Sequence, residues 1–146
     1  MVVSLHVATG AAAGALLASR RGAVAAGLLL HFLGDRLPHR DIASRPFEVT
    51  SGGILLALLA ARDGVAGPAL VGGFASSAPD LEHVLPFPRP GGRKLFPSHR
   101  IVGWHHGGGL PVWAQLLAAG VLVGAVLAGV RPRTRAEQAL PPRPRR

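Results

Sequence analysis

Apolar and polar positions fall into long alternating blocks along this chain, which predicts helices joined by polar connections. Five blocks are apolar and rich in Ala and Gly, at residues 5–19, 23–33, 53–61, 65–75 and 110–130. None of them shows the strict alternation that marks a half-buried strand. Val and Ile are also sparse relative to Ala and Leu, which favours helices over sheets. We therefore expect an all-α fold, a small bundle of about five helices.

The polar connections between these blocks differ in length. Residues 38–49 form a charged connection that contains proline, and residues 84–104 form a longer one rich in Pro and Gly. Loops of such length are usually functional. Residues 131–146 are rich in Pro and Arg, so we expect a basic disordered tail after a helical domain of residues 1–130.

The distribution of charge favours a membrane protein, although most of the apolar blocks are short and more typical of buried core helices. The mean hydropathy is +0.35 and the formal net charge is +9. Only residues 110–130 reach the about 20 residues that a bilayer core requires, but arginines concentrate in the connections that an outside N-terminus would place in the cytoplasm. We predict an integral, multi-pass protein of a bacterial inner membrane, with the N-terminus outside, the C-terminus cytoplasmic and the lipid bilayer as its partner. A soluble or peripheral helical bundle is the alternative.

Composition excludes several other classes of protein. The chain has no cysteine, so it contains neither disulfides nor thiolate metal ligands. Its aromatic content is low for a protein of such basic charge, and base stacking therefore has little support. We expect no nucleic-acid partner, and we interpret Trp104 as an anchor at a membrane interface.

The strongest chemical signal lies where the second apolar block ends. Asp35 follows His31 by four positions, which places the two side chains on one face of a helix. His39 follows Pro38 in a bend that brings it back toward the pair. Imidazole and carboxylate are the ligands of zinc and similar divalent cations, so this stretch predicts part of a metal site.

Five alternating helices place every histidine, and several acids, at the same end of the bundle. Asp80 and His83 also share a helix face by their spacing. The candidate metal ligands are His6, His31, Asp35, His39, Asp80, His83, His99, His105 and His106. Of the last two, we expect only one to bind the metal. These donors exceed what one ion needs, so we expect a divalent metal, zinc above others, in a site of one to three ions.

The carboxylates of this set are also the candidate catalytic groups. Asp35 and Asp80 are expected to bind the cations, and Asp35 has two oxygens with which to bridge a pair of ions. Glu82 faces away from Asp80 in a helix; it acts as a general base, supports a ligand, or is solvated, and we favour the solvated state. Four cations border the site and are candidates to bind an anionic small molecule or lipid: Arg36, Arg93, Lys94 and Arg100.

Several of these motifs resemble those of the bacterial inner-membrane metal-dependent hydrolases of the LexA-binding family, although the helix with His31 and Asp35 precedes the Pro-Asp motif here. The shared elements are His6 in an Ala-rich helix, Pro79-Asp80-Leu81-Glu82-His83, and His99-Arg100 followed by His105-His106. The family usually has Asp where this chain has Glu82, and a shorter spacing to the final histidine. The resemblance implies a membrane-bound, metal-dependent hydrolase.

A shorter match points to phosphate esters. His31-Phe32-Leu33-Gly34-Asp35, with Pro38-His39, is similar to the ligand helix of zinc-dependent phospholipase C and the single-strand nucleases. That resemblance implies zinc-assisted hydrolysis of phosphate esters or phospholipid-like substrates. The alternative is a membrane protein that binds metal without catalysis, or uses it only for structure.

Overall fold

The computed structural model describes residues 1–129, in which every regular element is a helix and no strand forms. Its long helices are α1 (Val3–Leu17), α2 (Arg20–Gly34), α3 (Arg45–Asp63), α4 (Pro68–Ser77) and α6 (Val112–Leu127). Three short elements link α4 to α6: the 3-10 helices η1 (Ala78–His83) and η2 (Pro90–Gly92), and α5 (Pro97–Arg100). The all-α prediction is confirmed, with six α-helices in the described residues because α5 forms inside the predicted loop. The predicted basic tail, residues 131–146, lies outside the described residues.

Local capping explains why α3 begins at Arg45 and not at residue 53. The Ser44 side chain accepts a hydrogen bond from the Phe47 amide at 3.4 Å, as N-cap serines do. Pro46 follows in the first turn, where its missing N–H costs no helical hydrogen bond. Residues 45–49 of the predicted polar connection therefore belong to the beginning of helix α3.

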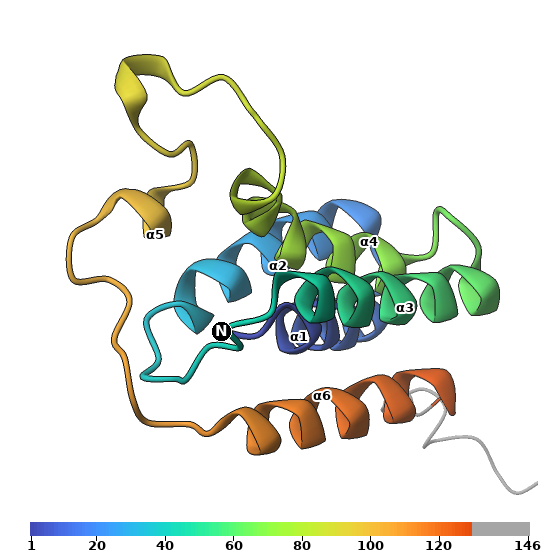
Figure 1. The fold of residues 1–146 in the computed structure, drawn as a ribbon. Helices are drawn as coiled ribbons and strands as arrows, with labels where there is room; N and C mark the ends of the chain where they lie inside the picture. Colours follow the sequence, from blue (N-terminus) through green and yellow to red (C-terminus); the bar gives the residue numbers. More distant parts are fainter. Residues whose placement is uncertain (130–146) are drawn as a thin grey trace, which may run out of the picture.

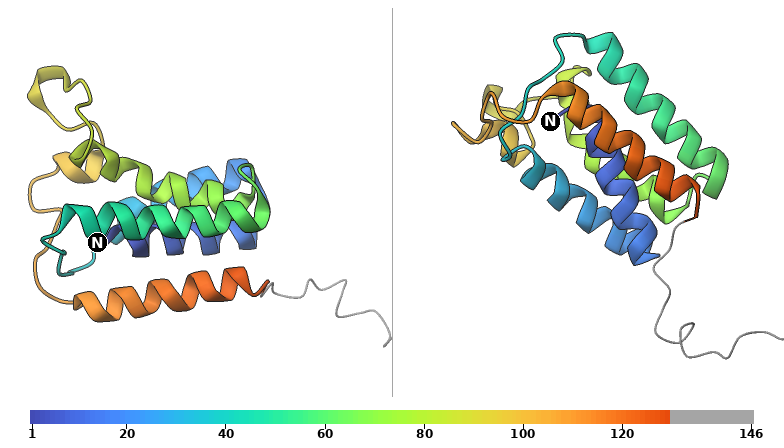
Figure 2. Two further views of the ribbon diagram at one scale, coloured as in Figure 1. Left: turned by 45° about the vertical axis from the view of Figure 1, so that its right-hand side comes forward. Right: turned by 90° about the horizontal axis from the view of Figure 1, so that it is seen from below.

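Helix α1 is the centre of the bundle and packs against α2, α3, α4 and α6. Figure 1 shows α2 and α4 on one side of α1 and α6 on the other. Seen from below, α6 runs alongside α1 and α3 (Figure 2). One apolar cluster joins the start of α1 to α6, and a second joins α1, α3, α4 and the end of α6.

Glycines let the backbones of α1 and α4 touch. A Cβ atom added to Gly10 would lie 2.2 Å from the carbonyl oxygen of Gly72, and one added to Gly14 would lie 2.0 Å from that of Pro68. Only a residue without a side chain fits at such an approach. This contact holds the end of α4, and with it the start of η1, close to α1.

A buried glutamine on α6 fastens the beginning of α1. Gln115 is fully buried; its Oε1 accepts from the Val2 amide at 3.0 Å, and its Nε2 donates to the carbonyl oxygens of Arg40 and Leu110 at 2.8 and 3.1 Å. These bonds join three segments that are distant in sequence. They position the first turn of α1, which carries His6.

We expect Gln115→Leu to lower the free energy of unfolding by about 1–3 kcal/mol, because it leaves the buried Val2 amide without a partner and removes the side-chain bond to the Arg40 carbonyl oxygen. Leu117→Ala, at a side chain that is largely exposed on the same helix, should change it by less than about 0.5 kcal/mol. Chemical denaturation monitored by circular dichroism measures both. Equal effects of the two substitutions would contradict the role assigned to Gln115.

The structure overturns the membrane prediction. Within residues 1–129 no helix combines the length and the apolar character needed to cross a bilayer. Helix α6, the predicted span, has 16 residues and is about 24 Å long, against a hydrocarbon core of about 30 Å. Helix α3 has 19 residues but carries Arg45, Glu48, Arg62 and Asp63. The multi-pass topology and the inner-membrane location inferred from it are therefore unsupported.

Candidate metal centre

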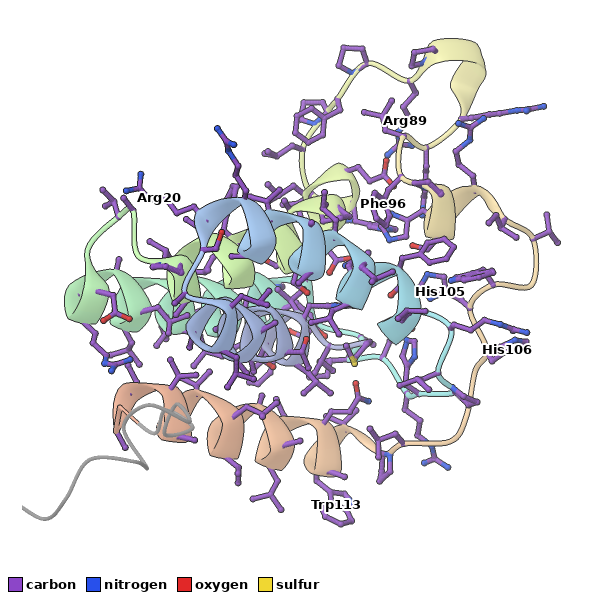
Figure 3. All side chains as sticks on the ribbon, turned by 180° about the vertical axis from the view of Figure 1, so that it is seen from behind. Arg20, Arg89, Phe96, His105, His106 and Trp113 are labelled. Carbon is purple, nitrogen blue, oxygen red and sulfur yellow. The ribbon has the colours of Figure 1, made fainter. Side chains whose placement is uncertain are left out.

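The histidines and acids meet at one end of the bundle. The start of α1, the end of α2 and the end of α4 all lie there, next to the segment that contains α5 (Figure 1). The opposite end carries Arg20 (Figure 3). Alternating helix direction produces this arrangement without any membrane. We call the five residues at its middle the His–Asp centre: His6, His31, Asp35, Asp80 and His99.

Asp35 lies in the middle of the centre and is 1% exposed. Its Oδ1 is 3.3 Å from His6 Nε2, and its Oδ2 is 3.1 Å from His31 Nε2 and 3.4 Å from His99 Nε2. Burial opposes ionisation of Asp35, but the surrounding imidazoles of His105, His31, His6 and His99 outweigh it and hold its pKa far below the usual range. The centre therefore contains a buried carboxylate that stays charged.

The ring of His31 is oriented by the backbone of α4. Its Nδ1 donates to the Ser76 carbonyl oxygen at 2.8 Å, so the neutral ring carries its lone pair on Nε2. This nitrogen faces Asp35, His99 and, at 4.0 Å, Asp80 Oδ1. A fixed tautomer with Nε2 free is what a metal-binding histidine requires.

His99 is oriented in the same way by Glu82. His99 Nδ1 donates to Glu82 Oε1, while Glu82 Oε2 accepts from the Leu95 amide at 2.6 Å. The expectation that Glu82 is solvated is wrong, since it is buried. Burial disfavours the charged form of His99, but hydrogen bonds to Asp35 and Glu82 outweigh it and raise its pKa.

Several polar atoms of the centre are buried without a partner. Among residues 1–129, both ring nitrogens of His6, Oδ1 of Asp35 and Oδ2 of Asp80 make no hydrogen bond. Burial lowers the pKa of His6 to about 3 and raises that of Asp80 to about 6. The Met1 ammonium group lies 3.6 Å from Asp35 Oδ1. Unpaired buried polar atoms are costly, and their concentration beside Asp35 is compatible with a bound cation.

Three overlapping sets of donors could hold a metal ion. In each set one atom from every residue lies within 4.8 Å of the others; the sets are His6, His31 and Asp80; His31, Asp35 and His99; and Asp80, His83 and His99. Asp80 Oδ1 is 3.6 Å from His99 Nε2, and its Oδ2 is 3.9 Å from His6 Nε2. The buried His and Asp side chains thus form a site that could bind a cation.

The remaining predicted ligands lie at the rim of the centre. His105 is 43% exposed but directs Nε2 to Asp35 Oδ2 at 3.3 Å. His106 instead contacts Arg36 and lies farther from the bundle (Figure 3), so the structure distinguishes these two neighbours. His83 is exposed, with its ring 4.5 Å from that of His99. His39 directs Nε2 to Asp41, at 3.1 Å, and its Nδ1 donates to a backbone carbonyl.

Trp104 attaches the 84–110 segment to α2. Its Nε1 donates to the Phe32 carbonyl oxygen at 3.0 Å, and the two aromatic rings lie 4.3 Å apart. The Arg36 guanidinium lies over the Trp104 ring at 5.3 Å. These contacts, and not a membrane interface, account for Trp104, and they bring His99 and His105 to the end of α2.

Comparisons with known proteins add no identity to this centre. No family model, curated protein or solved structure matches the chain. The resemblances to LexA-binding hydrolases and to zinc-dependent phospholipase C therefore stay predictions. Any function has to be argued from the geometry of the centre itself.

Sequence reasoning missed three groups that support the centre. Ser98 Oγ donates to Asp35 Oδ2 at 2.6 Å, and its position next to His99 was an available signal. Asp41 contacts His39 and follows it closely in sequence. The Ser76 carbonyl, which orients His31, leaves no trace in the sequence because any residue supplies a backbone oxygen.

We expect Glu82→Ala to weaken zinc binding by about 10–100-fold, as is typical when the partner of a ligating histidine is lost. Glu82→Gln should have a smaller effect, because its amide oxygen still accepts from His99 Nδ1. Competition with a chromophoric chelator measures both affinities. Wild-type affinity in Glu82→Ala would show that Glu82 does not position His99.

Proposed function

We propose that this protein is a zinc-dependent hydrolase that acts on phosphate or carboxylic esters. The observation that carries the proposal is the convergence of histidine Nε2 atoms on the buried Asp35 carboxylate. A tetrahedral zinc ion with bonds of about 2.0–2.1 Å holds its ligand atoms about 3.3–3.4 Å apart. The atoms His31 Nε2, His99 Nε2 and Asp35 Oδ2 are separated by 3.1, 3.3 and 3.4 Å, which fits one face of such a tetrahedron.

The donor set also fits zinc in its chemistry. Because Nδ1 of His31 and of His99 is bonded to Ser76 and to Glu82, the neutral form of each ring presents an Nε2 lone pair. The pKa of His99 is raised, so His99 would release its Nε2 proton on binding a cation, and the low pKa of Asp35 keeps that carboxylate charged. His6 and Asp80 form an alternative set with the same His31 Nε2, which has one lone pair and can serve only one ion at a time. A divalent cation bound here would act as a Lewis acid and lower the pKa of a coordinated water.

The protein supplies a place for substrate beside these ligands. A cavity of about 490 Å³ is lined by Asp35, Asp80, His83 and His105 among others. Asp80 therefore belongs both to the centre and to the wall of the cavity, and its carboxylate is the candidate acceptor for a proton of the attacking water. Glu82 does not reach this cavity; it keeps His99 oriented.

A metal that only stabilises the bundle is the second candidate. The complete burial of His6 and His31 favours it, because structural zinc sites are closed whereas catalytic sites keep an open position. The exposed edge formed by His105 and the adjacent cavity favour catalysis. The two functions differ in turnover and not in metal content.

The test combines zinc analysis with turnover. We expect purified protein to hold about one zinc ion or more per chain, and to release nitrophenol from bis(p-nitrophenyl) phosphate or p-nitrophenyl acetate. Asp80→Asn should abolish turnover, while Asp63→Asn, at the opposite end of the bundle, should not. Zinc without turnover would assign the structural function, and absence of zinc would refute both.

A further inference from the structure

Two cavities of opposite character reach the His–Asp centre. The first, described above, borders Asp35, Asp80, His83 and His105. The second has a volume of about 690 Å³ and borders the centre through His99. The His99 side chain is 1% exposed and separates this cavity from the centre. The two cavities adjoin where Lys94 of the second lies 3.3 Å from His83 of the first, so one molecule can extend from one cavity into the other beside the centre.

The first cavity has largely apolar walls away from the centre. Helix α3 contributes Val49 and Leu56, α4 contributes Phe74, and the segment after it contributes Leu81 and Val84. Phe74 is 53% and Val49 49% exposed, so these side chains are open to a ligand and not filled by the protein. Its volume is in the range of cavities that bind small molecules.

The second cavity is basic. It is lined by Arg93, Lys94 and Arg100, together with His99 and apolar side chains of the same segment. No carboxylate lines it. Arg and Lys around a concave surface bind phosphate and carboxylate groups, so this cavity is complementary to an anionic group.

We propose that the substrate is an anionic ester with an apolar chain, bound across the centre. This inference rests on the proposed hydrolase function and names its substrate class. The anionic group binds among Arg93, Lys94 and Arg100, and the apolar chain lies between α3 and α4 in the first cavity. The scissile ester then lies beside Asp35 and Asp80.

Gly53 provides a variant that fills the apolar cavity without disturbing the fold. It lines the cavity in the middle of α3, and a Cβ atom there meets no other atom within 4 Å. Gly53→Leu therefore projects a side chain into open space and raises helix propensity. Gly120→Leu is the matched control, because Gly120 has equal space on α6 and lines neither cavity.

The probes are ethylphosphonate and octylphosphonate, which are not hydrolysed, with binding measured by calorimetry on zinc-supplemented protein. Wild type should bind the octyl compound about 50-fold more tightly, since burial of half of its six additional methylenes gives this ratio. Gly53→Leu should reduce the ratio below about 5-fold with ethylphosphonate affinity unchanged, and Gly120→Leu should keep the wild-type ratio.

A charge variant tests the other cavity. Arg93→Gln/Lys94→Gln should lower the affinity for both phosphonates by about five-fold. Arg20→Gln/Arg21→Gln, at the opposite end of the bundle, should leave both affinities unchanged. An unchanged chain-length ratio in Gly53→Leu, or an unchanged affinity in the charge variant, overturns the proposal. If Gly53→Leu changes the oligomeric state but keeps the wild-type chain-length ratio, the cavity is a contact between copies of the chain. That result would also overturn the proposal.

These measurements separate this inference from the proposed function. Phosphonate binding with the expected variant effects, but without turnover of any ester, would uphold the binding mode and refute hydrolysis. Turnover of short and long esters with equal efficiency, together with a chain-length ratio near one, would uphold hydrolysis and overturn the substrate class.

Discussion

Replacement of Asp35 by Asn should remove tight zinc binding and the thermal stabilisation that zinc provides. Asp35 contacts His6, His31, His99 and His105 through its two oxygens, so its loss affects four of the candidate ligands at once. An amide lacks the negative charge and presents only one acceptor oxygen. We therefore expect a loss of affinity on the order of 100-fold or more, at or above the effect of losing a supporting residue.

Thermal unfolding with and without zinc measures this effect. At a zinc concentration of about 1,000 times Kd, binding stabilises the folded protein by about 4 kcal/mol, so the midpoint of wild type should rise by several degrees. Asp35→Asn should show no rise at the same concentration. Asp63→Asn is the control, since Asp63 pairs with Arg62 at the far end of α3. A full zinc response in Asp35→Asn would contradict the geometry proposed for the centre.

Gly72→Ala should separate α1 from α4 and lower the free energy of unfolding by about 3 kcal/mol. The added Cβ would lie 2.2 Å from the Gly10 carbonyl oxygen. Backbone atoms on both sides of this contact belong to helices, so the clash is relieved only by moving one helix. Because α4 leads directly into η1, the movement also displaces Asp80 relative to His6 and should weaken zinc binding.

Gly120→Ala is the matched control for this packing prediction. Its Cβ meets no atom within 4 Å, so the substitution should stabilise the protein by about 0.5–1 kcal/mol through helix propensity alone. Urea unfolding of both variants measures the difference. Similar stability of Gly72→Ala and Gly120→Ala would mean that the backbones of α1 and α4 are not in contact.

The helical blocks were predictable because their hydrophobic pattern is local, whereas the ends of the helices depended on single capping residues. Ser44 and Pro46 begin α3 eight residues before its apolar block. The membrane prediction failed for a related reason. Gly and Ala raise the apolar content of the chain, but Gly10, Gly14 and Gly72 serve close packing between helices, and hydropathy does not distinguish that use from lipid exposure.

The members of the centre could be named from sequence, but their individual positions could not. His31 and Asp35 are placed together by the helix itself, since i and i+4 share a face. In contrast, Glu82 reaches His99 only because η1 and α5 are adjacent in space. His105 and His106 are equivalent in sequence, and the attachment of Trp104 to Phe32 directs one toward Asp35 and the other outward.

The helical fold, and the placement of histidines and carboxylates at one end of antiparallel helices, can be predicted from the amino-acid sequence. These properties follow from local periodicity and chain direction. Which nitrogen of His31 and His99 faces Asp35 depends on tertiary contacts. Nδ1 of His31 is bonded to Ser76 and Nδ1 of His99 to Glu82, and both partners are remote in sequence. The helix end at residues 31–39 supplies His31 and Asp35 to a site that could bind a cation, and those remote hydrogen bonds orient its histidines.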